Sequence, residues 1–104
     1  VDYSGEQPGG AKEGVTYFDH PSNLGHPAHW HVREDGWMGA SVCFAAPRTT
    51  TKLKPLTLRY LLHAHRGPVD AKRADEAFAG FARRPAFELV KAPAKHTAWG
   101  VRRA

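Results

Sequence analysis

The chain has 104 residues, enough for a single domain with a modest hydrophobic core. Its 15 basic and 10 acidic residues give a formal net charge of +5, but they are spread along the chain without alternating basic and aromatic residues, so we expect a solvated basic surface and no nucleic-acid partner. No apolar stretch approaches the ~20 residues that a membrane-spanning helix needs, and the single cysteine excludes an internal disulfide.

The first part of the chain, residues 1–13, is rich in glycine and charged residues and predicts a loop between two strands. The sequence starts at Val1 rather than at methionine. We therefore expect the C-terminal fragment of a larger β-sandwich protein. In that case the remainder of the parent chain would be a partner that covers apolar faces left open here.

A strand is predicted over residues 14–19, which are β-branched and aromatic, and Pro21 ends it. The segment after it contains Asn23, which tolerates left-handed backbone geometry, and Gly25, which adopts that geometry freely. The chain is therefore expected to turn within residues 22–27.

A short strand over residues 29–33 would send Trp30 and Val32 to the core. The side chains expected on its opposite face are His29, His31 and Arg33. The apolar segment 37–46 follows without strict alternation, so we expect a buried strand or an irregular insert, with Cys43 buried.

The clearest strand is predicted over residues 55–65. One of its faces is wholly apolar: Leu56, Leu58, Tyr60, Leu62 and Ala64. A helix is predicted from an N-cap at Asp70 to about Arg84, because apolar residues recur there at helical spacing, and residues 87–91 predict a last strand. The expected fold is mostly β: an antiparallel β-sandwich portion with one α-helix near the C-terminal end.

One group of residues could carry acid–base or sugar-binding chemistry: Asp19, His20, Asn23, His26 and His31. A histidine exchanges protons near neutral pH, and a carboxylate can fix its tautomer or raise its basicity. A tryptophan such as Trp30 could stack on a sugar ring. The alternative is that these polar side chains cap and brace a proline-containing turn through hydrogen bonds.

A His-x-His pattern occurs twice, at His29/His31 and at His63/His65. On a strand such a pair projects two imidazoles from one face, and a third ligand would complete a divalent metal site of the cupin kind. The alternative is that these are ordinary strand histidines. A structural or interaction domain without chemistry of its own is a further alternative.

The segment 18–33 resembles a block found in an uncharacterised bacterial family known as PmoA-like, or methane oxygenase PmoA. Its members tend to carry Asp-His-Pro-x-Asn-Pro-Arg-His-Pro-Thr-x-Trp-His-Val-Arg. The matching positions here are Asp19, His20, Pro21, Asn23, His26, Pro27, Trp30, His31, Val32 and Arg33. Residues 2–5 and 56–81 are also similar to the family's layout, so the likeness covers most of the chain.

This resemblance implies a sandwich of the galactose-mutarotase-like, carbohydrate-associated kind, in proteins longer than this chain. The favoured function is a module that binds a carbohydrate or another small molecule, or acts on it through histidine acid–base chemistry. The expected catalytic residues are His20 and His31, with Asp19 as the orienting partner. The expected ligand-binding residues are Asn23, His26, Trp30 and Arg33. We expect no metal and no cofactor in this reading.

Overall fold

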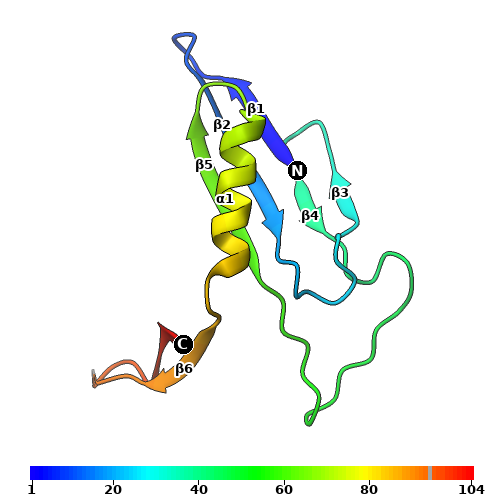
Figure 1. Cartoon of the computed structure of the whole chain (residues 1–104), viewed down its shortest axis with the longest axis vertical. Coiled ribbons are helices and arrows are strands. Elements are labelled where there is room, and N and C mark those ends of the chain that lie inside the picture. Colours follow the sequence, from blue (N-terminus) through cyan, green and yellow to red (C-terminus); the bar gives the residue numbers. More distant parts are fainter. Residues whose placement is uncertain (94) are drawn as a thin grey trace.

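The computed structural model describes residues 1–93 and 95–104, and it is mostly β with antiparallel sheets and one helix near the C-terminal end (Figure 1). Its strands are β1 (Asp2–Glu6), β2 (Lys12–Asp19), β3 (Trp30–Val32), β4 (Met38–Ala40), β5 (Tyr60–Arg66), β6 (Phe87–Lys91) and β7 (Trp99–Arg103). Its helix is α1 (Ala71–Arg83). The expected fold class is confirmed, and the arrangement is consistent with a small β-sandwich-like fold.

The central sheet has the strand order β1-β2-β5, and both pairs of neighbours are antiparallel. Strand β2 contains the predicted strand 14–19. The prediction of a loop over residues 1–13 is wrong in part, because β1 pairs with β2 from Asp2 opposite Thr16 to Glu6 opposite Lys12. Backbone pairing to a central strand stabilises this polar, glycine-containing segment, although its own residues favour strands weakly.

The predicted helix is confirmed as α1, and it covers one face of the central sheet (Figure 1). Its N-cap is Asp70, whose carboxylate accepts a hydrogen bond from the Arg73 backbone N–H at 2.8 Å. The rings of Phe78 and Phe18 lie 6.0 Å apart between helix and sheet. Phe81 is 6% exposed and is the one buried hydrophobic side chain among the described residues. The apolar core therefore lies at the C-terminal half of α1.

The prediction of a strand over residues 55–65 is wrong at its start, since β5 begins at Tyr60. Because side chains alternate along β5, Leu61 and His63 face α1 whereas Leu62 points to the other side and is 64% exposed. The helix thus covers the mixed face of β5, whereas on the more apolar face Trp30 packs against Tyr17 and Leu62 stays exposed.

Of the two alternatives for segment 37–46, the structure shows the irregular insert, and the expected burial of Cys43 is wrong. Strand β4 is only three residues long, and the chain then leaves the sheets as a long loop (Figure 1). Cys43 is exposed, and Phe44 is 71% exposed with its ring stacked on His29. A segment that leaves the sheet after three residues has no second layer to cover its apolar side chains.

Two short hairpins complete the structure, β3–β4 and β6–β7. Trp30 on β3 packs against Tyr17 at 4.9 Å between ring centroids, as the alternation predicts, but Val32 is 53% exposed. Strand β6 is confirmed, whereas β7 lies in a tail that gave no strong signal. No helix in the described part of the chain is long and apolar enough to cross a membrane.

The variant Phe81→Ala should lower the free energy of unfolding by about 3 kcal/mol or more, because it removes the buried ring between α1 and the sheet. Chemical denaturation would measure the loss. The matched control is Phe87→Ala, whose ring is 60% exposed and whose removal should change stability much less. Equal losses in the two variants would show that the core is not where the structure places it.

Candidate functional site

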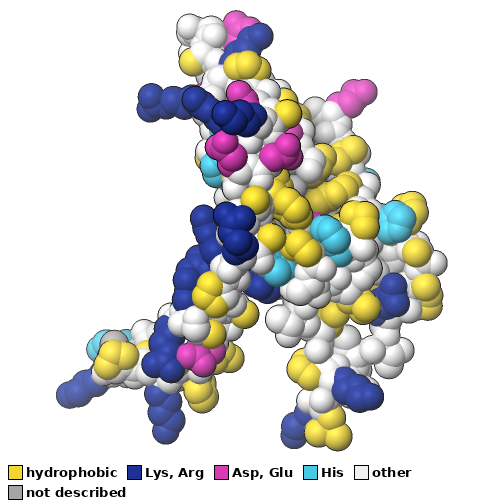
Figure 2. Space-filling model, viewed as in Figure 1, with side chains coloured by type: hydrophobic (Ala, Val, Ile, Leu, Met, Phe, Trp, Pro, Cys, Tyr) yellow, Lys and Arg dark blue, Asp and Glu magenta, His cyan; other side chains and the backbone are white. Residues whose placement is uncertain are grey.

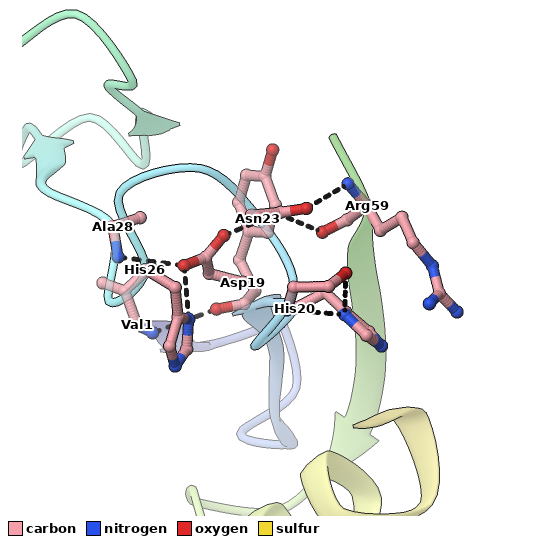
Figure 3. Close-up of polar contacts among 9 residues, drawn as sticks. Val1, Asp19, His20, Asn23, His26, Ala28 and Arg59 are labelled. Carbon is pink, nitrogen blue, oxygen red and sulfur yellow. Dashed lines mark hydrogen bonds and ion pairs between the residues drawn. The ribbon is translucent and has the colours of Figure 1, made fainter. Parts of the chain in front are cut away.

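A buried carboxylate stands where β2 ends. Asp19 is 7% exposed, and the loop after it folds back so that three groups donate hydrogen bonds to it (Figure 3). Asn23 Nδ2 donates to Oδ1 at 2.7 Å, while His26 Nδ1 and the Ala28 backbone N–H donate to Oδ2 at 2.7 Å and 2.9 Å. A buried carboxylate is stable only with such partners, so Asp19 fixes the shape of the loop.

The side chain of Asn23 joins this loop to the residue before β5. Its Nδ2 donates to the Arg59 carbonyl at 2.7 Å, and its Oδ1 accepts from the Arg59 backbone N–H at 2.8 Å. The Asn23 side-chain amide therefore satisfies both backbone groups of Arg59, as a neighbouring strand would. The predicted turn within residues 22–27 is confirmed, and it uses positive φ at Gly25 (+79°) but not at Asn23.

His26 is the imidazole that Asp19 orients. Because Nδ1–H donates to the carboxylate, Nε2 carries the lone pair, and the side chain is still 30% exposed. The ring lies nearly parallel to that of Phe78, at 6.4 Å between centroids and 9° between planes. A carboxylate–imidazole pair whose imidazole side chain is partly exposed has the arrangement of a general acid–base group.

His20 is buried, at 5% exposure, and packs edge-on against Phe81 at 4.9 Å. Its Nδ1 accepts from the Ser22 backbone N–H at 3.0 Å, which places the proton on Nε2, and this buried nitrogen has no hydrogen-bond partner among the described residues. Burial, followed by the nearby Arg59 charge, lowers the pKa of His20, and the Ala82 carbonyl and Asp19 oppose this shift without reversing it. His20 is thus a neutral packing group between β2 and α1.

The other predicted site residues lie elsewhere. His31 is exposed on β3, and Trp30 packs on Tyr17. Arg33 pairs with Asp35 at 2.8 Å, and both side chains are exposed. Within the described residues, none of the three predicted site residues forms a hydrogen bond to the Asp19 network. The structure therefore brings together Asp19, Asn23 and His26, with His20 beside them.

A cavity next to Asp19 has a volume of about 50 Å³. It is lined by residues of the loop and of the segment after β4, among them Gly25, Ala28, His29 and Ser41. Ligand pockets measure about 300–1,000 Å³, so this cavity holds no sugar ring. A ligand of that size would have to meet His26 at the molecular surface.

A second polar network, which the sequence analysis missed, lies at the other end of the central sheet. Asp2 accepts hydrogen bonds from Ser4 and, at 2.6 Å, from Thr16, and it pairs with His65 Nε2 at 2.8 Å. Because His65 Nδ1 also lies 3.1 Å from the Gly67 carbonyl, both ring nitrogens face acceptors. Gly14 leaves room for the ring, since a Cβ there would lie 2.7 Å from His65 Cε1.

The charge state of Asp2 follows from this network. Burial raises its pKa, but the hydrogen bonds from Ser4, Thr16 and His65, together with the His65 charge, outweigh burial and leave the pKa below its ordinary value. The pairing of β1, β2 and β5 brings these side chains together. In the sequence, the pattern that could have indicated the contact is that Thr16 and His65 lie on the same face of two neighbouring strands.

The two His-x-His pairs do not converge on further ligands. His29 stacks on Phe44, and His65 is paired with Asp2. Over residues 1–93 and 95–104, no group of three or more histidine, cysteine or acidic side chains is arranged to hold a metal ion. The described residues therefore offer no set of ligands for the metal site that the His-x-His pairs suggested.

The variant Asp19→Asn should lower the free energy of unfolding by about 2–3 kcal/mol, because it removes a buried charged acceptor that three donors share. Urea unfolding near neutral pH would measure the loss. The matched control is Asp35→Asn, which changes an exposed carboxylate and should cost well under about 1 kcal/mol. Similar costs for both variants would contradict the central role of Asp19.

Stability should fall as the pH drops below the unfolded histidine value of about 6.5, because unfolded His20 binds a proton that the folded ring resists. Above that pH this contribution is fully present. Unfolding free energies at a series of pH values should show a smaller acid-side loss in His20→Gln than in the wild type. The exposed His31→Gln variant is the control and should keep the wild-type slope. An unchanged slope in His20→Gln would mean that His20 protonates freely in the folded chain.

Comparison with known proteins places the chain in a family without assigning an activity. A family model described as a family of unknown function, DUF6807, matches residues 1–79. No curated protein and no solved structure matches the chain. The matched part contains strands β1 to β5, both polar networks and most of α1. The chain belongs to the family of unknown function DUF6807.

Proposed function

We propose that this chain is a carbohydrate-associated β module in which His26, oriented by Asp19, exchanges a proton with a sugar. The observation that supports the acid–base part is the 2.7 Å contact between His26 Nδ1 and a buried, triply bonded Asp19 carboxylate. The sugar part rests on the resemblance of residues 18–33 to the PmoA-like block and on its implied galactose-mutarotase-like relatives. The proposal transfers the acid–base role expected of His20 and His31 to His26.

The chemistry follows from where each proton lies. The Asp19 carboxylate holds the proton of His26 on Nδ1, so Nε2 can take the proton of the anomeric hydroxyl while the bond between the anomeric carbon and the ring oxygen breaks, and can then give this proton to the ring oxygen. The reverse transfers, after the hydroxyl adds to the other face of the open-chain aldehyde, close the ring as the other anomer. The carboxylate also stabilises the imidazolium that forms in between. This sequence of steps is the one that interconverts the anomers of a free sugar, and it requires no cofactor.

The position of the pair suits a ligand at the surface. The side chain of His26 is 30% exposed, and its ring stacks on the ring of Phe78. Trp30 packs against Tyr17, on the face of β2 opposite to Phe18 and Phe78, so the proposal does not use it. A sugar would therefore bind across an open face rather than in an enclosed pocket.

A structural brace is the second candidate function. Asp19 and Asn23 are both buried, their hydrogen-bonding groups are engaged with the loop and with Arg59, and the adjacent cavity is only about 50 Å³. These features are those of a polar network that fixes a turn. In this case His26 would complete the brace and meet no substrate.

The variant His26→Gln should slow the anomerisation of free galactose or glucose by about a hundredfold or more, down to the uncatalysed rate. Polarimetry follows the reaction directly, and NMR titration of the same sugars measures binding. His29→Gln is the matched control, because His29 is a loop histidine that stacks on Phe44 and has no carboxylate partner among the described residues, so this variant should leave the rate unchanged.

The two candidate functions separate on the wild type and on this pair of variants. Catalysis by the wild type and by His29→Gln, but not by His26→Gln, supports the proposal. If no sugar binds and none is anomerised, while His26→Gln lowers only the stability, the network is a brace. Equal activity in all three proteins would place the catalytic group elsewhere.

A further inference from the structure

The net charge of the chain lies wholly in its last quarter. Residues 1–79 carry nine basic and nine acidic residues, whereas residues 80–104 carry six basic residues and one acidic residue, Glu88. The charge is thus not spread evenly, contrary to the expectation from composition. Figure 2 shows dark blue side chains gathered over the end of α1 and the arm that holds β6 in Figure 1. This basic part begins where the family match ends.

The β6–β7 hairpin adds an apolar face to this charge. The antiparallel register pairs Phe87 with Arg103, Leu89 with Val101 and Lys91 with Trp99, and directly opposite side chains share one face. The four apolar members of this face are 59–72% exposed: Phe87, Leu89, Trp99 and Val101. The four apolar side chains therefore lie together, with Arg103 at one end of the hairpin face and Lys91 at the diagonally opposite end.

Among residues 1–93 and 95–104, neither Lys91 nor Arg103 has an acidic partner on this face. The Arg103 guanidinium lies 4.5 Å from the centroid of the Phe87 ring, a cation–π contact that keeps its charge beside the apolar centre. The nearby acid, Glu88, is on the opposite face of the hairpin, where it accepts from Arg102 Nε at 2.6 Å. Glu88 thus does not offset the charges that flank the apolar face.

We propose that this face of the β6–β7 hairpin docks onto the surface of a bilayer that contains anionic lipid. Apolar side chains flanked by cations suit the boundary between acyl chains and headgroups, where tryptophan is also favoured. Each lysine or arginine near an anionic surface adds attraction that salt screens. This function is independent of the one proposed for His26, which lies in the neutral part of the chain.

Other occupants fit the face less well. A second copy of this chain would bring the same five net positive charges to the contact, and the two would repel each other. A nucleic acid would satisfy the basic side chains, but its phosphates would leave Leu89 and Val101 uncovered. Only a partner that is both anionic and apolar matches the whole face.

The test is co-sedimentation of the full chain with vesicles of phosphatidylcholine alone and with an equal mixture of phosphatidylcholine and phosphatidylglycerol. Binding is expected to the mixture only and should fall as salt is raised. The double variant Lys91→Ala with Arg103→Ala should bind about thirtyfold more weakly. The variant Leu89→Asn should bind about tenfold more weakly.

Matched controls exist in the neutral part of the chain. Lys52→Ala with Lys54→Ala removes two exposed charges, and Leu53→Asn removes a leucine that is 91% exposed, so all three substitutions should leave vesicle binding unchanged. Quenching of Trp99 fluorescence by brominated lipid would report insertion of this face, with Trp99→Phe identifying the signal.

Four results would overturn the proposal. The first is vesicle binding that does not depend on the phosphatidylglycerol content, and the second is an equal loss of vesicle binding in the hairpin variants and their controls. The third is self-association of the chain without vesicle binding. The fourth is binding to a DNA duplex or single-stranded RNA without vesicle binding.

Discussion

The hydrogen bonds to the Asp19 carboxylate are the interaction on which the rest of the site depends. A buried carboxylate without partners is strongly unfavourable, so the loop after β2 can adopt only a path that brings Asn23, His26 and the Ala28 N–H to it. The same constraint sets the orientation of the His26 ring and ties the loop to Arg59. The acid–base proposal and the brace are therefore two consequences of one carboxylate.

Polar networks carry much of the order in this structure because the apolar core is small. Phe81 is the one buried hydrophobic side chain in the described residues, whereas Asp19, His20, Asn23 and Thr16 are all buried. Asp–His pairs stand at the two ends of the central sheet, Asp19 with His26 and Asp2 with His65, and each joins segments that are apart in sequence. Each carboxylate sets the orientation of the imidazole that it contacts.

The two parts of the chain, residues 1–79 and 80–104, differ in charge and in the exposure of their apolar side chains. The part matched by the family model is electrically neutral and holds both Asp–His pairs, while the part after it carries the whole positive charge and an exposed apolar hairpin face. Burial is needed for the pairs to orient imidazoles, and exposure is needed for a docking face. Placing them in separate segments lets each have its own environment.

The sequence by itself determined the elements whose information is local: strand β2, the helix with its Asp70 cap, strand β6 and the mostly β class. It also pointed to Asp19, Asn23 and the histidines as one polar group. Tertiary structure alone decided that β1 pairs with β2, that His26 rather than His20 or His31 meets Asp19, and that α1 covers the face of β5 with His63. These outcomes depend on non-local pairing and on which side the helix returns, and neither periodicity nor propensity encodes that choice.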